Sequence, residues 1–207
     1  MQADSVAIVV TAVGKQLPGY CRWTLPFIAA YCARHGYRLE ILHLPPDDKR
    51  NASWQKLLAF HAIPESVSTA VLIDMDVMPM PWAGPIHESL SGTEISMCQH
   101  GDVWQCGVIG LPRCKREWAE NIYRCGDWGS TGNWFEQTDV NRSLNSGDET
   151  CNKMHGKWNH IPGRMFRPRL LEPNGVQFLH CAGLSRRHKK AGRLEAAWKL
   201  LSPQLFQ

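Results

Sequence analysis

The stretch from Ala70 to Met80 constrains the fold of this chain more than any other. It opens with an apolar, β-branched run typical of a buried strand and ends with Asp74 and Asp76, one residue apart. Two neighbouring carboxylates at the edge of a protein interior lose solvation and repel each other, so we expect a cation between them. Because side chains alternate along a strand, Asp74 and Asp76 should point to one side and Met75 to the other. The stretch predicts a metal-diphosphate site beyond a buried strand.

Strands and helices alternate along the first 76 residues. The apolar spacing predicts strands over 6–10, 38–44 and 70–76, and helices over 20–35 and 53–63. Gly36 is expected to end the first helix, and Pro26 is a candidate for its start. This alternation predicts an α/β fold with a doubly wound sheet, mainly parallel and flanked by helices. The length of 207 residues suits one domain over 1–207.

The second half of the chain has a less regular pattern. It predicts strands over 94–98, 103–111 and 176–179, helices over 114–124 and 134–144, a loop over 126–132, and a last helix after the basic run 186–193. Residues 145–175 are rich in Gly, Pro, Asn and aromatic side chains, so we expect irregular structure or short strands there.

Composition narrows the class of protein. The eight cysteines include no Cys-x-x-Cys pair, so we expect no structural zinc. The sequence has neither a signal-like amino terminus nor an apolar run of about 20 residues, so we expect a cytoplasmic location and reduced thiols. The formal charge of +4 with a pI of about 8.7 allows an anionic ligand without requiring a nucleic acid.

His180 is a candidate third ligand for the predicted cation. It ends the last predicted strand and precedes Gly183 and the basic run 186–193. An imidazole could complete a metal site with Asp74 and Asp76, and the cationic side chains beyond it could bind phosphate oxygens. Two carboxylates, one imidazole and a diphosphate suit Mn²⁺ or Mg²⁺ better than zinc.

These patterns together resemble those of the GT-A glycosyltransferases, nearest to the retaining glycogenin-like and the galactosyl- and xylosyltransferase-like families. The resemblance rests on five patterns in order, from the first strand to about residue 190: Ser53-Trp54-Gln55-Lys56, Asp74-Met75-Asp76, Gly107-Val108-Ile109, Glu136-Gln137 with Asn141, and His180-x-x-Gly183. It implies a GT-A, Rossmann-like fold with a doubly wound mixed sheet, mainly parallel, and an enzyme that transfers a sugar from a nucleotide-sugar donor, with a UDP-sugar expected first.

The resemblance also implies roles for individual residues. Asp74, Asp76 and His180 would bind Mn²⁺ or Mg²⁺. The donor contacts implied by the resemblance are Thr11, Lys56, Asp74, Met75, Asp76, Gln105, Gly107, His180, Gly183 and Arg186. Glu136 and Gln137 would line the reacting face of the sugar, and Glu136 or Asp139 would act as general base if the reaction inverts. The acceptor hydroxyl could belong to a glycan, a protein, a lipid or a modified nucleic acid.

The chain departs from the family pattern in several places. Gln105 stands where relatives commonly have Asn, Thr138 replaces an Asp, and the chain is shorter than most members. Two other hypotheses stay open: a nucleotidyltransferase, and a nucleic-acid-binding or nucleic-acid-modifying protein that uses the basic run 186–193. In a simpler interpretation, Glu136 is an ordinary helix-surface acid and the basic run is a solvated helix face.

Overall fold

A computed structural model describes residues 1–13, 19–45, 50, 52–126, 136–162, 175–181 and 187–204. Its main sheet has six strands in the order β2-β1-β3-β6-β5-β7. Their bounds are β1 Val6–Val13, β2 Arg38–Leu44, β3 Thr69–Ile73, β5 Ile95–His100, β6 Val103–Pro112 and β7 Cys151–Met154. A second sheet pairs β4 (Val77–Pro79) with β8 (Phe178–His180).

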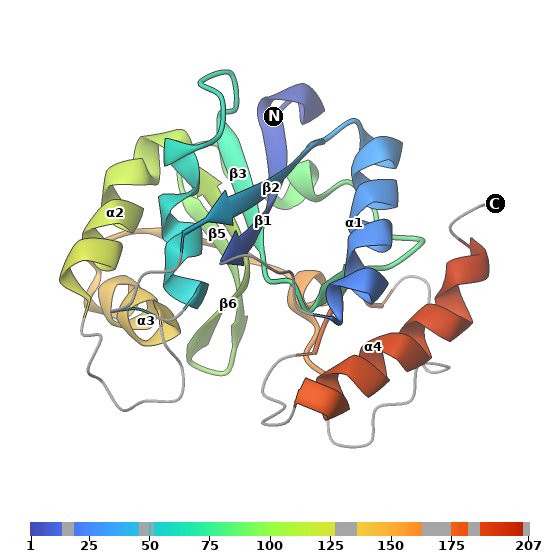
Figure 1. Ribbon diagram of the computed structural model, residues 1–207. Coiled ribbons are helices and arrows are strands. Elements are labelled where there is room, and N and C mark those ends of the chain that lie inside the picture. The colour runs from blue at the N-terminus through green and yellow to red at the C-terminus, as the bar shows by residue number, and fades with distance from the viewer. Residues whose placement is uncertain are drawn as a thin grey trace.

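Helices cover both faces of the main sheet. The α-helices are α1 Cys21–His35, α2 Arg116–Cys125, α3 Glu136–Ser146 and α4 Arg187–Leu201. Short 3-10 helices are η1 Ala3–Ser5, η2 Ala52–His61, η3 Ile86–Ser89, η4 Arg113–Lys115, η5 Gly156–Asn159 and η7 Ser202–Gln204. In Figure 1, α1 and α4 lie on one side of the sheet and α2 and α3 on the other. Each side encloses its own apolar cluster, so the sheet is buried on both faces.

The predicted alternation explains the parallel half of the main sheet. β1 pairs in parallel with both β2 and β3, as the strand-helix order requires. β6 then runs antiparallel to β3 and to β5, while β7 is parallel to β5, so the sheet is mixed. The predicted α/β class and doubly wound, mixed sheet are confirmed.

The predicted first helix is confirmed: α1 begins at Cys21, directly after the predicted Tyr20, and only the alternative start at Pro26 is wrong. α1 ends at Gly36, whose φ of 71° is the left-handed conformation that glycine adopts most easily. Pro26 lies inside the helix rather than at its start. The aromatic packing of Trp23 and Phe27 against Trp198 of α4 holds this part of α1 in place despite the missing backbone donor of Pro26.

The second predicted helix forms a 3-10 helix, η2, instead of an α-helix. Its buried apolar side chains recur every three residues at Trp54, Leu57 and Phe60, which is the period of a 3-10 helix. This spacing is compatible with both helix types over so short a stretch, which is why the sequence pattern did not separate them.

In the second half, the predicted strands correspond to β5, β6 and β8, and the predicted helices to α2, α3 and α4. The short strands β4 and β7 were not predicted individually. Most of the predicted 126–132 loop lies outside the described residues. No helix within the described ranges is long and apolar enough to span a membrane.

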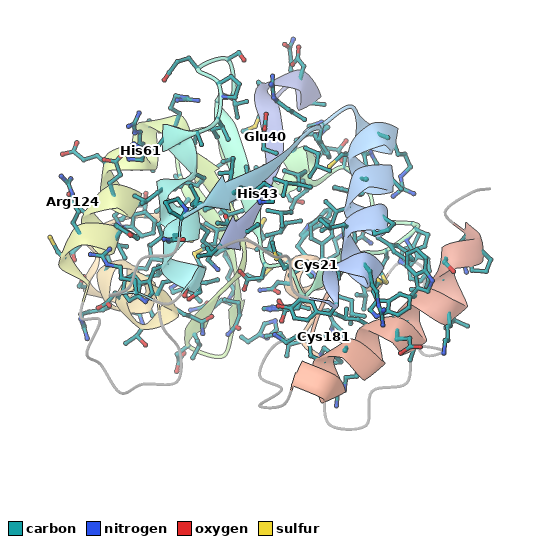
Figure 2. All side chains as sticks on the ribbon, in the orientation of Figure 1. Cys21, Glu40, His43, His61, Arg124 and Cys181 are labelled. Carbon is teal, nitrogen blue, oxygen red and sulfur yellow. The ribbon has the colours of Figure 1, made fainter. Side chains whose placement is uncertain are left out.

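All eight cysteines fall within the described residues and are free. Cys21 and Cys181 lie on the side of α1 and α4, whereas His61 and Arg124 lie on the opposite side of the molecule (Figure 2). Both Cys21 and Cys181 are buried in the apolar cluster against α1 and α4, close behind the site described next.

Candidate functional site

The two aspartates lie in a tight turn between β3 and β4. The strand ends at Ile73, and the backbone N–H of Val77 donates to the carbonyl of Asp74 at 2.9 Å. The N–H of Asp74 donates to the carbonyl of Gly107 on β6 at 3.0 Å. The backbone of the turn is therefore anchored at both ends, and both carboxylates reach the same side although the residues are not in a strand.

Met75, between them, points to the other side, as predicted. Its sulfur lies 3.3 Å from the Sγ of Cys21, and its carbonyl accepts a hydrogen bond of 2.8 Å from the Thr24 hydroxyl. Both partners belong to α1. The side chain of Met75 thus packs into the core, and only its backbone could contribute to the donor contact implied for this residue.

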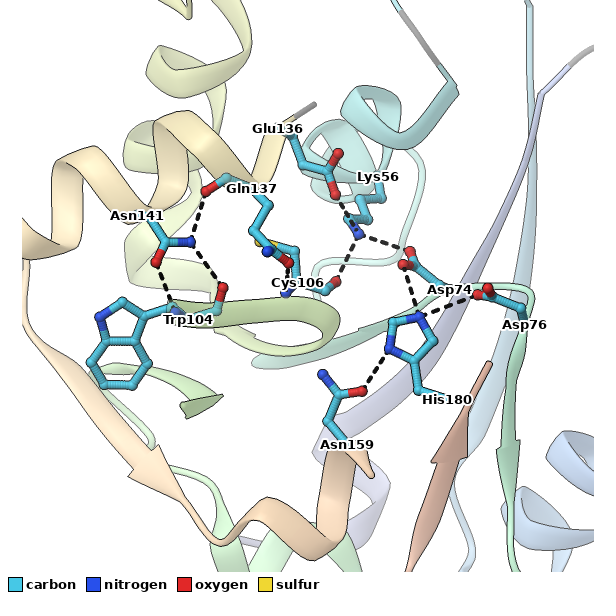
Figure 3. Close-up of polar contacts among 10 residues, drawn as sticks. All are labelled: Lys56, Asp74, Asp76, Trp104, Cys106, Glu136, Gln137, Asn141, Asn159 and His180. Atoms are coloured by element: carbon cyan, nitrogen blue, oxygen red, sulfur yellow. Dashed lines mark hydrogen bonds and ion pairs between the residues drawn. The ribbon is translucent and has the colours of Figure 1, made fainter. Parts of the chain in front are cut away.

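β8 places His180 beside the two carboxylates. It pairs antiparallel with β4 so that His180 is opposite Val77, and the N–H of Cys181 donates to the carbonyl of Asp76 at 3.1 Å. The Nε2 atom of His180 lies 3.4 Å from Asp76 Oδ1 and 3.8 Å from Asp74 Oδ2 (Figure 3). One possible ligand atom from each residue falls within 4.8 Å of the others.

Asn159 orients the ring of His180, and Gly107 leaves the space that the ring occupies. The Oδ1 of Asn159, a fully buried side chain on η5, lies 2.8 Å from His180 Nδ1. In the neutral ring, a proton on Nδ1 satisfies this acceptor and leaves the Nε2 lone pair facing the carboxylates, the form that binds a metal. A Cβ added at Gly107 would lie 2.2 Å from the ring, so only glycine leaves room for it.

Lys56 of η2 holds the other oxygen of Asp74. Its Nζ lies 2.7 Å from Asp74 Oδ1, 2.8 Å from Glu136 Oε1 and 2.7 Å from the carbonyl of Cys106 (Figure 3). Burial alone would lower the pKa of Lys56, but the carboxylates of Asp74 and Glu136 raise it above its usual value. The ammonium group therefore stays charged, and its three donors are already used.

Lys190 of α4 holds the outer oxygen of Asp76 in the same way. Its Nζ forms an ion pair with Oδ2 of Asp76, while Oδ1 faces His180. Burial by itself would raise the pKa of Asp76, but His180 and Lys190 together hold it below its ordinary range. The basic run is thus not only a solvated helix face, because one of its members reaches the site.

Side chains at the start of α3 pair with the backbone of β6 where this strand extends beyond β3. The Oε1 of Gln137 accepts from the N–H of Cys106 at 3.0 Å. Asn141 accepts from the N–H of Trp104 at 2.7 Å and donates to the carbonyl of Trp104 at 2.8 Å. These contacts hold the start of α3 on β6, with Glu136 beside Lys56 and Asn141 beside Trp104 (Figure 3).

The remaining predicted residues are spread more widely. Thr11 lies in β1 just beyond the end of its pairing with β3, with a buried hydroxyl that has no partner among the described residues. Gln105 is buried on β6, two residues before Gly107, at the point where the pairing of β6 with β5 becomes irregular. Asp139 is buried on α3 and pairs with Arg142. Gly183 and Arg186 lie outside the described residues.

The donor set fits a hard divalent cation. Two carboxylate oxygens and one imidazole nitrogen converge, and the second oxygen of each carboxylate is held by a lysine. Mn²⁺ and Mg²⁺ accept such ligands and leave positions for phosphate oxygens. The sequence patterns did not reveal Asn159 as a partner of His180 or Lys190 as the partner of Asp76. Only the basic composition of the run 186–193 pointed toward Lys190.

The fold is similar to that of several solved glycosyltransferases. The first is a glycosyltransferase involved in glycosylation of the major capsid of PBCV-1, with a TM-score of 0.71 and 15% identity, covering 91% of this chain and 99% of that one. Mouse xyloside xylosyltransferase 1 has a TM-score of 0.52 and 10% identity, covering 84% and 97%. Galactosyltransferase LgtC, solved with donor and acceptor sugar analogues, has a TM-score of 0.54 and 12% identity, covering 95% and 96%.

No protein-family model matches the chain, and no curated protein matches its sequence. At these low identities the comparisons establish the fold, and this chain has the GT-A fold. The predicted GT-A architecture is therefore confirmed, and the three structures are similar along nearly their whole lengths.

Proposed function

We propose that this chain is a metal-dependent glycosyltransferase that moves a sugar from a nucleotide-diphosphate donor, with UDP-sugars as the first candidates, to an acceptor hydroxyl. One observation carries the proposal: at the carboxyl end of a central strand in a GT-A fold, Asp74, Asp76 and His180 converge within 4.8 Å. In open α/β sheets, ligands bind beyond this end of the strands. The three solved structures of similar fold are named as glycosyltransferases.

Asp74, Asp76 and His180 would hold Mn²⁺ or Mg²⁺. When bound, the ion would supply positive charge that stabilises the departing nucleoside diphosphate. Arg186, and the basic side chains after it, would add further positive charge around the diphosphate. Thr11, within β1, and Lys56, within η2 and paired with Asp74, would be further donor contacts.

Glu136 and Gln137 would lie beside the reacting face of the sugar. The structure supports positioning roles for both, since Glu136 is paired with Lys56 and the Oε1 of Gln137 accepts from the Cys106 N–H. We propose retention of configuration, in which the acceptor hydroxyl attacks from the face that the diphosphate leaves and a phosphate oxygen takes its proton. No protein base is then needed, and Asp139 would serve as a base only in an inverting reaction.

A binding screen tests the proposal. Thermal shifts are measured for a panel of nucleotide sugars with Mn²⁺ or with EDTA, using the wild type, Asp76→Asn and the control Asp102→Asn. Asp102 is an exposed carboxylate in the turn between β5 and β6. With Mn²⁺, we expect a UDP-sugar to stabilise the wild type and Asp102→Asn but not Asp76→Asn. With EDTA, we expect it to stabilise none of the three. Equal stabilisation of Asp76→Asn, or stabilisation that survives EDTA, would contradict the proposal.

Product analysis then separates the reaction types. A glycosyltransferase releases UDP from a UDP-sugar, whereas a nucleotidyltransferase releases inorganic diphosphate from UTP and a sugar phosphate. Once an acceptor is found, NMR of the anomeric proton distinguishes retention from inversion. Release of diphosphate without any release of UDP would favour the nucleotidyltransferase.

A further inference from the structure

The two aspartates of the site share a symmetric arrangement. In each carboxylate, one oxygen pairs with a lysine and the other lies near Nε2 of His180. Asp74 pairs with Lys56 through Oδ1, and its Oδ2 lies near Nε2. Asp76 pairs with Lys190 through Oδ2, and its Oδ1 lies near Nε2. The outer oxygens are therefore paired with lysines, and the inner oxygens converge with the imidazole.

The charges in this arrangement nearly cancel. With the His180 ring in the neutral form that binds a metal, the cluster has three carboxylates, Asp74, Asp76 and Glu136, and two ammonium groups, Lys56 and Lys190, which leaves one net negative charge. A divalent cation changes this to one net positive charge. A site of this kind attracts a bare cation weakly, but it attracts a diphosphate strongly once the cation is present.

Lys190 contributes less to the stability of the fold than Lys56 does. The backbone of Asp76 is held without it, because the carbonyl of Asp76 accepts from Cys181 and β4 pairs with β8. The side chain of Lys190 is 21% exposed, while that of Lys56 is 4% exposed. Its other described contact is with the ring of Tyr20, 5.5 Å from Nζ.

We propose that Lys190 sets the order of binding at this site: it weakens the binding of a bare divalent cation at Asp76 and strengthens the binding of the nucleotide diphosphate that follows. This inference rests on the function proposed above and adds a role for a residue of α4 that lies outside the predicted ligand set. Lys190 is a positioning and charge-setting residue, because it contacts Asp76 and not the expected metal position.

The experiment measures two affinities with opposite expected changes. Mn²⁺ binding is followed by the EPR signal of free Mn²⁺, and UDP binding at saturating Mn²⁺ is followed by calorimetry. In Lys190→Met we expect Mn²⁺ to bind about five- to tenfold more tightly and UDP about five- to tenfold more weakly, because one positive charge beside the site is lost. Lys190→Arg keeps the charge and should resemble the wild type in both measurements.

Lys199 provides the matched control. It lies on the same helix, is 71% exposed and pairs with Glu195 at 2.9 Å. Lys199→Met removes the same charge from α4 and should leave both affinities unchanged. If Lys190 only held Asp76 in place, Lys190→Met would weaken Mn²⁺ and UDP together. That result, or no change in Mn²⁺ affinity, would overturn the inference.

The outcome for the proposed function can be separated from this result. Wild-type binding of Mn²⁺ that is lost in Asp76→Asn supports the metal site whatever Lys190→Met does. Mn²⁺ binding to the wild type without the opposite shifts in Lys190→Met would reject only the role of Lys190. A wild type that binds no Mn²⁺, with or without UDP, would reject both proposals.

Discussion

The two lysines of the site differ in how they are held, although each pairs with one aspartate. Lys56 is buried against the sheet and uses all three of its donors, on Asp74, Glu136 and the carbonyl of Cys106. Lys190 is partly exposed on α4, and among the described residues it forms an ion pair with Asp76. A lysine enclosed by the fold contributes to stability, whereas one at the rim can adjust ligand binding at little cost to the fold.

The largest effect should come from removing the enclosed lysine. Lys56→Met leaves the buried Glu136 carboxylate and Asp74 without their shared cation, which should lower the free energy of unfolding by about 3–5 kcal/mol. Urea denaturation measures this change. A loss below about 1 kcal/mol would show that the buried cluster is not a stabilising element.

A second variant identifies the source of this loss. Adding Glu136→Gln to Lys56→Met removes the buried charge that lost its partner, so the double variant should be more stable than Lys56→Met alone. A double variant that is less stable would mean that the loss arises from packing of the lysine stem rather than from the unpaired carboxylate.

Gly107→Ala tests the space that β6 leaves for the imidazole. The added Cβ would lie 2.2 Å from Cε1 and Nδ1 of His180, so the ring must move. We expect a loss of about 1–3 kcal/mol in the free energy of unfolding and a clear loss of Mn²⁺ affinity. Gly92→Ala is the control, since the end of Met1 is the only group of the described residues within 4 Å of the added Cβ. Normal Mn²⁺ binding by Gly107→Ala would remove His180 from the ligand set.

Asn159 tests the orientation of the same ring without adding volume. Asn159→Ala removes the partner of His180 Nδ1, which should cost about 1–3 kcal/mol of stability and lower Mn²⁺ affinity by about 10- to 100-fold. Asn159→Asp keeps an acceptor at that position and should keep Mn²⁺ affinity, measured by EPR. If both variants bind Mn²⁺ as the wild type does, Asn159 does not orient the ligand.

Asn159 is also an example of a site residue that the sequence did not reveal. The first half of the fold follows from local patterns, because apolar runs and helix ends such as Gly36 are encoded within a few neighbouring residues. Asp74 and Asp76 stand out for the same reason, as two charges after an apolar strand. His180 could be chosen only by its place after the last strand, and the resemblance to a family supported that choice.

The partners of these residues depend on contacts between distant segments. Asn159 lies in the stretch 145–175, whose sequence predicted no defined element, and it reaches His180 because the chain at His160 pairs with β8. Lys190 meets Asp76 because α4 packs beside α1. The three donors of Lys56 are likewise satisfied by three separate elements. Such pairings follow from the arrangement of the sheet and have no local signature.

The smallest effect on stability is expected at Lys190. Because its side chain is partly exposed and Asp76 keeps His180, Lys190→Met should lower the free energy of unfolding by only about 1 kcal/mol, well below the loss for Lys56→Met. Saturating Mn²⁺ should cancel this difference, because a variant that binds the cation up to tenfold more tightly gains about 1.4 kcal/mol more from it. The Lys56→Met loss should largely persist with Mn²⁺, since Glu136 lies outside the ligand set. Urea titrations of both variants with and without Mn²⁺ measure this, and a Lys190→Met loss that Mn²⁺ does not reduce would show that the two lysines play the same structural role.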